Sequence, residues 1–342
     1  MNNPLRVVLA GCGGISAEWL RAAAQMPDLA IVGLVDLRLA AAEARAVEFG
    51  LTAAQTGDDL VAMLAATQPD IVFNVTIPAA HLAVTLTALA QGCHVLCEKP
   101  LADSMDAARR TVAAAEDAGR LVAIIQNRRY QPQIRRLRRL IAAQQLGALT
   151  TLTSDFYLGP RFGGFRDEMQ HVLLLDMAIH TFDMARFLIG ADPVAVFCKE
   201  WNPAGSWYAH GASAIALFEM SDGSVYSYRG SWCAEGAPTS WESSWRIVGS
   251  SGSALWDGAE QLTAAAVSGP GGFFADTTDL IVPALADDDR IGGHAGLIAE
   301  FAACVRAGTT PETHVADNIK SLAMVFAAIE SATTRRMVDV MW

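Results

Sequence analysis

The chain has 342 residues, of which 52% are hydrophobic, and its formal net charge is −11 at pH 7. This length exceeds what one ordinary hydrophobic core serves, so two domains are expected. The negative charge argues against a nucleic-acid partner, because it would repel the phosphates.

The first residues, MNNPLRVVLAGCGG, lack the charged leader, apolar stretch and cleavage site of a secretory signal. No apolar run is long enough to cross a bilayer, so we expect a cytoplasmic protein with no membrane partner. The six cysteines form no paired CxxC modules and are expected to be reduced thiols. Cys93, His94 and Cys97 lie in a strand-like apolar stretch rather than a ligand loop, so no metal site is predicted.

Strand-like and helix-like patterns alternate through the first third of the chain. Apolar runs predict strands at 5–13, 30–36, 70–78, 93–100 and 121–127, and helices at 16–26, 39–50, 58–67, 79–92 and 103–119. Continuous apolar strands that alternate with helices are typical of a doubly wound parallel sheet. We therefore predict an α/β fold with a nucleotide-binding type of domain over residues 1–125.

The pattern changes after residue 125. A helix at 133–146 precedes a strand at 151–159, a loop at 160–170 and an apolar helix at 173–190. Strands at 195–201, 212–233 and 243–257, with turns at SDG and GSSG, are followed by helices at 287–308 and 316–336 and a short strand at 337–342. Residues 126–342 are thus predicted to form an α+β domain on an open, mainly antiparallel sheet. The arginines of 128–139 are expected on a solvated or intersubunit helix face.

A glycine-rich turn joins the first predicted strand to the first predicted helix. Gly11, Gly13 and Gly14 occupy this turn, and Ser16 stands where the usual third glycine would be. Glycines there permit a tight turn and let backbone amides approach a pyrophosphate, which then lies at the helix N-terminus. The position between strand and helix is the context that this motif requires.

Asp36 ends the second predicted strand, where a carboxylate accepts hydrogen bonds from the adenosine ribose hydroxyls. Its negative charge disfavours the extra phosphate of NADP. Arg38 follows two residues later and is able to receive that phosphate. The sequence predicts NAD, with NADP as the alternative. If these residues bind no cofactor, they are simply a turn aspartate followed by a surface arginine.

At CEKPLA, residues 97–102, the sequence resembles the glucose–fructose oxidoreductase/inositol dehydrogenase/MocA (Gfo/Idh/MocA) family. The resemblance extends over essentially the whole chain and includes the glycine turn, TIPAAH at 76–81, NRRYQP at 127–132, the D-x-x-x-H pair and ESATTRR before MVDV. It implies an N-terminal NAD(P)-binding Rossmann domain, and then a domain whose large open sheet faces the nicotinamide.

The resemblance also implies roles for individual residues. With the glycine turn and the second strand, the predicted cofactor-binding set is Gly11, Gly13, Gly14, Ile15, Asp36, Leu37, Arg38, Thr76, Pro78, His81, Glu98, Lys99 and Asn127. The predicted substrate-binding set consists of Lys99, Asp176 and His180, which match the family's polar groups, and of four residues in segments expected to face the cleft: Arg129, Tyr157, Arg166 and His171. QHVLLL at 170–175 replaces a glycine-rich approach found in many members, and Ala178 replaces a common glycine, so the family supplies no role for His171.

The helix predicted at 173–190 is apolar on most of its circumference, yet it carries Asp176, His180 and Asp183. In an α-helix, positions 180 and 183 lie about 40° and −20° from position 176, so the three side chains share one stripe. Oxidation of an alcohol needs a base that titrates near neutral pH, which favours His180 as proton acceptor. Lys99 would be the cationic donor to the reacting oxygen, and Asp176 would bind a neighbouring hydroxyl.

Purely structural roles are the alternative. In this case Asp176 and His180 would pair with each other, and Asp183 would bond to Arg186 or Arg129. Lys99 would then be only the residue at the end of a strand. The roles of Lys99 and His180 are also interchangeable if the two groups titrate as one coupled unit. Asp183 is assigned to structure. Five tryptophans are expected either to stack on a sugar ring or to lie in a core or subunit interface: Trp201, Trp207, Trp232, Trp241 and Trp245.

The resemblance implies a dehydrogenase that transfers hydride between NAD(P) and a secondary alcohol or anomeric carbon of a sugar, sugar acid or cyclic polyol. Two other functions stay open on the same fold, namely an NAD-retaining, redox-assisted glycoside hydrolase and a non-catalytic dinucleotide-binding regulator. Many relatives assemble through the exposed sheet face, so a homodimer or homotetramer is expected.

Overall fold

A computed structural model describes residues 3–286 and 289–342. The chain forms two compact units, one built from the residues up to Tyr130 together with Arg290–Leu322, and the other from Gln131–Asp289 together with Ala323–Trp342. Within the described ranges, no helix combines the length and the apolar character needed to cross a membrane.

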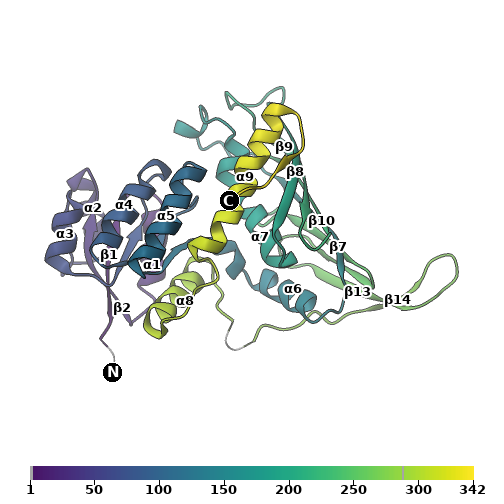
Figure 1. Cartoon of the computed structure of the whole chain (residues 1–342), viewed down its shortest axis with the longest axis horizontal. Coiled ribbons are helices and arrows are strands. Elements are labelled where there is room, and N and C mark those ends of the chain that lie inside the picture. Colours follow the sequence, from purple (N-terminus) through teal and green to yellow (C-terminus); the bar gives the residue numbers. More distant parts are fainter. Residues whose placement is uncertain (1–2, 287–288) are drawn as a thin grey trace. The chain divides into compact units, whose positions relative to one another are not determined.

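The first unit has a six-stranded parallel sheet in the order β3-β2-β1-β4-β5-β6. Two of its strands, β1 and β2, are labelled in Figure 1. This strand order is that of dinucleotide-binding doubly wound folds, in which ligands bind beyond the carboxyl ends of the strands. Its elements are β1 (Leu5–Ala10), α1 (Ser16–Ala23), β2 (Leu29–Val35), α2 (Leu39–Glu48), β3 (Gln55–Gly57), α3 (Leu60–Thr67), β4 (Ile71–Asn74), α4 (Pro78–Ala90), β5 (His94–Cys97), α5 (Met105–Ala118), β6 (Val122–Ile124), the 3-10 turn η1 (Asn127–Tyr130) and α8 (His294–Ala307).

The central strands of this unit are buried because helices cover both of their faces, which explains their nearly continuous apolar sequences. Trp19 of α1 and Phe73 of β4 pack in the same core as Phe301 of α8, a helix that comes from the far end of the chain. The edge strand β3 was not among the predicted strands, because its sequence QTG has no apolar residue.

The second unit has a nine-stranded sheet in the order β14-β13-β12-β11-β7-β10-β9-β8-β15. β7 and β10 pair in parallel, and the other neighbouring strands pair antiparallel. Its elements are α6 (Pro132–Ala142), β7 (Leu149–Tyr157), the 3-10 turn η2 (Gly164–Arg166), the π-helical turn η3 (Leu173–Ala178), α7 (Ile179–Ile189), β8 (Pro193–Trp201), β9 (Ser213–Met220), β10 (Val225–Ser231), β11 (Ser244–Gly249), β12 (Gly252–Trp256), β13 (Leu262–Gly269), β14 (Asp276–Asp279) and β15 (Val338–Asp339). α9 (Val315–Thr334) contributes its residues after Leu322 to this unit.

One face of this sheet is covered by α7. Phe182 of α7 makes edge-to-face contacts with Phe218, Tyr226 and Tyr228, which point inward from β9 and β10 (ring centroids 4.9, 6.2 and 5.2 Å away). The alternation of buried and exposed residues along β9 follows from this one-sided burial.

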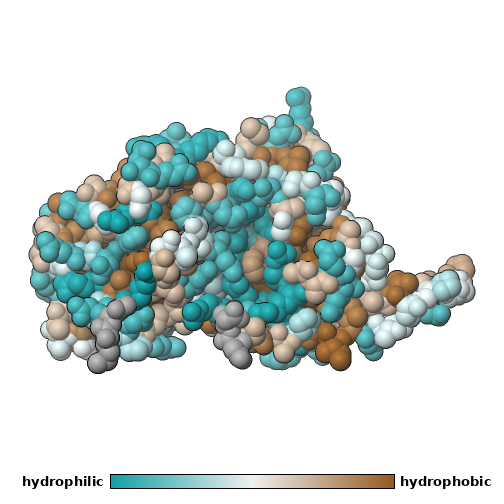
Figure 2. All heavy atoms as spheres, turned by 60° about the horizontal axis from the view of Figure 1, so that its bottom comes forward, coloured by the Kyte–Doolittle hydropathy of each residue, from teal (hydrophilic) through white to brown (hydrophobic). Residues whose placement is uncertain are grey.

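The β13–β14 hairpin was not predicted from the sequence. It extends past the other strands as an arm that is visible at the right of Figures 1 and 2. Phe273 and Phe274 at its tip are 95% and 80% exposed. Few residues of the arm are buried, so it lacks the apolar alternation from which strands are predicted.

Three sequence expectations in the second half of the chain need correction. The helix predicted at 173–190 begins as a π-helical turn, so the α-helical angles apply to His180 and Asp183 but not to Asp176. The helix predicted at 287–308 begins at His294, and its residues 287–288 lie outside the described ranges. The arginines at 128–139 are buried or half-buried rather than fully solvated: Arg139 pairs with Asp289 at 2.8 Å, and Arg136 donates to the carbonyls of Pro283 and Val282. Their alternative place on an intersubunit face stays a prediction.

Candidate active site

The glycine turn after β1 has the backbone that the motif requires. Gly11 has φ +96°, and a Cβ there would lie 2.6 Å from the Val75 carbonyl oxygen. Beside Gly13 and Gly14, by contrast, a Cβ would meet no atom of the described residues within 4 Å. The turn is therefore tightly packed behind Gly11 and open beside the next two glycines, which suits a pyrophosphate held on backbone amides at the start of α1.

Asp36 is fixed at the end of β2. Its Oδ2 accepts from the Cys12 amide at 2.9 Å and its Oδ1 from the Arg38 amide at 2.9 Å. The Arg38 side chain is 80% exposed, with Nε 3.8 Å from Asp36 Oδ1. Arg45 was not predicted as a site residue, and its Nη2 donates to the Gly13 carbonyl at 2.9 Å. Asp36 thus links the end of the second strand to the glycine turn.

The segment after β4 is braced by His81. Its Nδ1 lies 2.8 Å from the Pro100 carbonyl oxygen and its Nε2 lies 3.0 Å from that of Thr76. Pro78 begins α4, a position where proline costs no hydrogen bond. Burial lowers the pKa of His81, and the two carbonyl contacts offset only part of this effect. Both ring nitrogens face the backbone, so His81 holds the Thr76 and Pro100 segments together.

Glu98 and Lys99 follow β5 at the carboxyl edge of the parallel sheet, and the Lys99–Pro100 peptide bond is cis. Glu98 is buried, with Oε1 accepting from the Trp19 indole at 3.1 Å and Oε2 from the Lys99 amide at 2.8 Å. Burial alone would raise the pKa of Glu98, but His294, Lys99 and Trp19 outweigh it, so this pKa lies below its ordinary value. A buried carboxylate that stays ionised therefore anchors the backbone of Lys99.

The N-x-R segment forms η1, directly after β6. Asn127 Nδ2 lies 3.3 Å from His294 Nδ1. Arg129 is buried, and its guanidinium donates to Asp317 Oδ2 and to the Glu312 carbonyl, both at 3.2 Å. These contacts give Arg129 a structural role in the first unit, whereas its predicted substrate contact remains a prediction.

Asp176 and His180 both belong to the second unit, and both are buried. Asp176 lies in the π-helical turn η3 and accepts from Arg166 Nε at 2.8 Å. π-Helical turns occur often at functional sites, because the extra residue changes the direction in which side chains project. His180 lies in the first turn of α7. Arg186 pairs with Asp192 at 3.3 Å, and Asp183 is fully buried.

Loops at one end of the nine-stranded sheet surround this segment. Arg166 lies over the rings of Phe162 and Phe165, at 5.2 and 4.7 Å. Burial raises the pKa of Tyr208, and the nearby carboxylates of Asp176 and Asp167 raise it further. Tyr208 was not predicted as a site residue, although these interactions place it in the neighbourhood of Asp176.

The remaining aromatic side chains divide between core and surface. Tyr157, at the end of β7, is half-buried, and burial raises its pKa. Trp232 and Trp245 are core residues, whereas Trp201 and Trp241 are exposed. Arg161 lies 4.1 Å from the half-buried ring of Trp207.

His171 has a partner that the sequence did not suggest. Its backbone has φ +53°, and its Nδ1 lies 2.5 Å from Glu200 Oε2 of β8. The hydrogen bond to Glu200 raises the pKa of His171, which outweighs the lowering effect of burial. Gln170 contacts His210 at 2.9 Å, so residues 170–171 are tied to the loop after β8 at two points.

The His171–Glu200 pair leads to a prediction about pH. Because the folded-state pKa is raised, the pair adds stability below the unfolded pKa of about 6.5, and this stability is lost as the pH rises through the folded value. In Glu200→Gln, the NMR titration midpoint of His171 is expected to fall. Urea unfolding of this variant should show a larger loss of stability at pH 6 than at pH 8. An unchanged midpoint would contradict the assignment.

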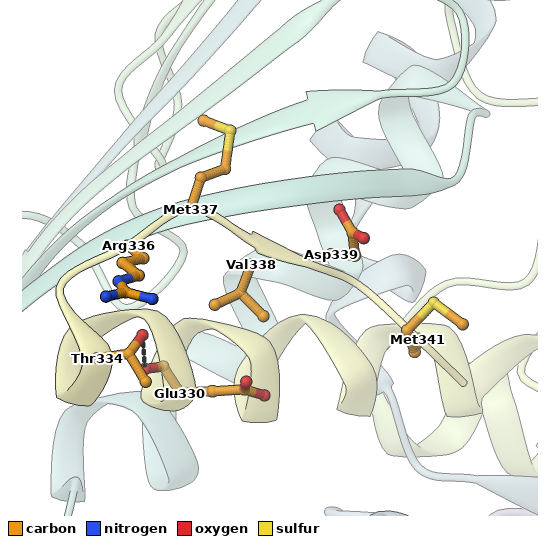
Figure 3. A pocket seen from close by; sticks show the side chains of 7 residues that line it. All are labelled: Glu330, Thr334, Arg336, Met337, Val338, Asp339 and Met341. Atoms are coloured by element: carbon orange, nitrogen blue, oxygen red, sulfur yellow. Dashed lines mark hydrogen bonds between the residues drawn. The ribbon is translucent and has the colours of Figure 1, made fainter.

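A shallow hollow of about 430 Å³ lies between the end of α9 and β15 (Figure 3). Its walls are formed by Glu330, Thr334, Arg336, Met337, Val338, Asp339 and Met341. None of these residues is among the site residues predicted from the sequence. The hollow therefore gives no support to the predicted site.

Comparisons with known proteins agree with the fold. The model for the oxidoreductase family with an NAD-binding Rossmann fold matches residues 5–126, and the model for the GFO/IDH/MocA C-terminal domain matches residues 134–255. The D-glucoside 3-dehydrogenase of Escherichia coli is 34% identical over 55% of this chain and 55% of that protein. The D-apiose dehydrogenase of Paraburkholderia graminis is 26% identical over 97% of this chain and 88% of that protein.

Among solved structures, an oxidoreductase from Agrobacterium radiobacter in complex with NAD+, L-tartaric acid and magnesium covers 99% of each chain, with a TM-score of 0.86 and 22% identity. This likeness concerns the fold. The parallel sheet with its glycine turn, matched by the NAD-binding model, defines an oxidoreductase with an NAD-binding Rossmann domain. Because the second model matches the part that follows, the chain belongs to the Gfo/Idh/MocA family.

Proposed function

We propose that this protein is an NAD(P)-dependent dehydrogenase that oxidises a secondary alcohol or anomeric carbon of a sugar, sugar acid or cyclic polyol. The observation that carries the proposal is Lys99, which follows β5 at the ligand-binding edge of the sheet and whose amide is held by the ionised carboxylate of Glu98. The names of D-glucoside 3-dehydrogenase and D-apiose dehydrogenase support the substrate class.

The residues around the glycine turn fit a dinucleotide. The open space beside Gly13 and Gly14 supports a pyrophosphate there, and Asp36, which accepts from the Cys12 amide, is the proposed partner of the ribose hydroxyls. NAD, when bound, supplies the acceptor for the hydride of the alcohol. Ile15, Leu37, Thr76, Pro78, His81, Glu98 and Asn127 complete the proposed cofactor-binding set.

The proton of the alcohol is assigned to side chains of the protein. His180 is the proposed acceptor, since an imidazole titrates near neutral pH. The Lys99 ammonium is the proposed donor that stabilises the developing alkoxide. Asp176, held by Arg166, binds a neighbouring hydroxyl. Tyr157 and His171 are the further proposed substrate contacts, and Arg129 supports the segment that carries Asn127.

The choice of coenzyme follows from Asp36. A carboxylate at the ribose disfavours the 2′-phosphate of NADP, whereas the exposed Arg38 is the group that would accept it. We expect a lower Michaelis constant for NAD than for NADP. Equal or better use of NADP would contradict this assignment.

The test is a screen of aldoses, inositols and sugar acids with NAD, followed by absorbance at 340 nm. A dehydrogenase accumulates NADH in step with the loss of substrate. Glycoside cleavage without net NADH would instead identify the redox-assisted hydrolase. Tight NAD binding without any turnover would favour the regulatory alternative.

We also propose that the protein is a homodimer or homotetramer. The outer face of the nine-stranded sheet exposes Phe197 and Leu217, which are directly paired across β8 and β9, and nearby Ile215. Clustered apolar side chains on a sheet face are typical of an interaction site. Sedimentation at micromolar concentration should give a mass larger than the 36.3 kDa of one chain. A single species with the mass of one chain would contradict the proposal.

A further inference from the structure

His294 is the first residue of α8, and it lies against the carboxylate that anchors Lys99. Its Nε2 is 3.8 Å from Glu98 Oε1, and its ring meets the Trp19 ring edge-on at a centroid distance of 6.1 Å. All of these residues belong to the first unit. His294 is separated by almost two hundred residues of sequence from the segment it contacts.

The orientation of the imidazole follows from its other nitrogen. Nδ1 lies 3.3 Å from Asn127 Nδ2, and an amide nitrogen only donates hydrogen bonds. With the amide in this orientation, Nδ1 is the acceptor and the proton of the neutral ring is on Nε2. The imidazole therefore directs an N–H toward Glu98.

Glu98 needs such neighbours because it is almost inaccessible to water. A buried carboxylate is costly unless donors or positive charges compensate for the lost hydration. Trp19 and the Lys99 amide each use one oxygen, and His294 is the third polar group beside the carboxylate. The separation of 3.8 Å exceeds a hydrogen bond, so His294 acts here as an oriented dipole rather than a direct partner.

We propose that His294 is a positioning residue that acts through Glu98 to hold Lys99 in its reactive placement. The proposal rests on the proposed dehydrogenase function, since it concerns the lysine of that reaction. His294 itself need not touch substrate. It keeps the Glu98 carboxylate ionised and in place, and Glu98 in turn fixes the backbone from which the Lys99 side chain extends.

The test compares three substitutions of His294. The amide nitrogen of glutamine takes nearly the position of histidine Nε2, whereas that of asparagine takes nearly the position of Nδ1. His294→Gln therefore keeps the N–H that faces Glu98, and His294→Asn and His294→Leu remove it. The matched control is His94→Leu, at the opposite end of β5, which removes a histidine whose Nδ1 accepts from the Leu121 amide at 3.0 Å.

We expect His294→Leu and His294→Asn to lower kcat by about 10- to 100-fold, because small displacements of a reacting group have effects of this size. The Kd for NAD and the KM for the alcohol should change less than kcat. His294→Gln should recover most of the turnover, and His94→Leu should retain it. A role limited to folding would not separate glutamine from asparagine.

A second measurement does not depend on turnover. The chain has only three lysines, Lys99, Lys199 and Lys320, so reductive ¹³C-methylation gives a spectrum in which Lys99 is identified by the signal lost in Lys99→Arg. The Lys99 signal should move in His294→Leu and His294→Asn and keep its place in His294→Gln.

The outcomes separate the two proposals. If no alcohol is oxidised by the unmodified protein but the Lys99 signal follows this pattern, the dehydrogenase assignment fails and the positioning role of His294 stands. If His294→Leu retains both kcat and the Lys99 signal, or if folded His294→Gln behaves like His294→Leu, the positioning role is wrong. Thermal unfolding of each variant identifies any that does not fold. If His294→Leu does not fold, the comparison of His294→Gln with His294→Asn tests the positioning role.

Discussion

Lys99→Met is expected to lower kcat by about 10³-fold while leaving NAD binding close to normal. Methionine approximates the length of lysine but removes the ammonium, so the developing alkoxide loses its charged donor. The backbone anchor survives, because Glu98 Oε2 accepts from the amide of residue 99 and not from its side chain. The glycine turn and Asp36 are untouched.

The measurements are steady-state turnover on the substrate identified in the screen and the Kd for NAD by fluorescence titration. Lys199→Met is the matched control, because Lys199 is an exposed lysine of β8 and its loss should leave both quantities unchanged. Near-normal turnover in Lys99→Met would overturn the assignment of Lys99 and, with it, the main support for the proposed reaction.

Gly11→Ala is expected to destabilise the first unit by about 2–4 kcal/mol even without coenzyme. The residue has φ +96°, where a side chain is strained, and its new Cβ would lie 2.6 Å from the Val75 carbonyl oxygen and 2.8 Å from the Thr76 amide nitrogen. These are backbone atoms of the segment after β4, so relief requires the strand ends to separate. Urea unfolding of the coenzyme-free protein measures the effect.

Gly13→Ala provides the contrast within the same turn. In the part of the chain that the structure describes, a Cβ at this position meets no atom within 4 Å, so the stability of the coenzyme-free protein should change by less than about 0.5 kcal/mol. The same open space is where the pyrophosphate is proposed to approach, and the Kd for NAD should therefore rise roughly tenfold or more. Equal loss of stability in the two variants would mean that the two glycines do not have different functions.

Local patterns in the sequence predict the parallel sheet and its glycine turn well, because buried parallel strands are continuous apolar runs and the turn needs residues without a Cβ. Lys99 is found in the same way, since the strand that precedes it is recognisable. The antiparallel sheet is predicted where one face is buried, as in β9. It is missed in β13 and β14, where few residues are buried and no alternation develops.

The supporting residues of the site were not predictable, for physical reasons. Trp19, Arg45, His294 and Glu200 contact residues that lie 29 to 196 positions away in the chain, counted from the residue numbers of each pair. No local periodicity encodes such contacts. The π-helical turn at Asp176 was also missed, because a buried π-helix and a buried α-helix have the same apolar composition.

The first unit is discontinuous, and this affects how the chain can be divided. Leu297, Ile298 and Phe301 of α8 fill the same core as Trp19 and Phe73. A fragment cut after Tyr130 would expose that apolar surface to water and lose His294 from the side of Glu98. No single truncation of the gene therefore produces the dinucleotide-binding unit intact. A recombinant protein that is to contain this unit must include both of its segments.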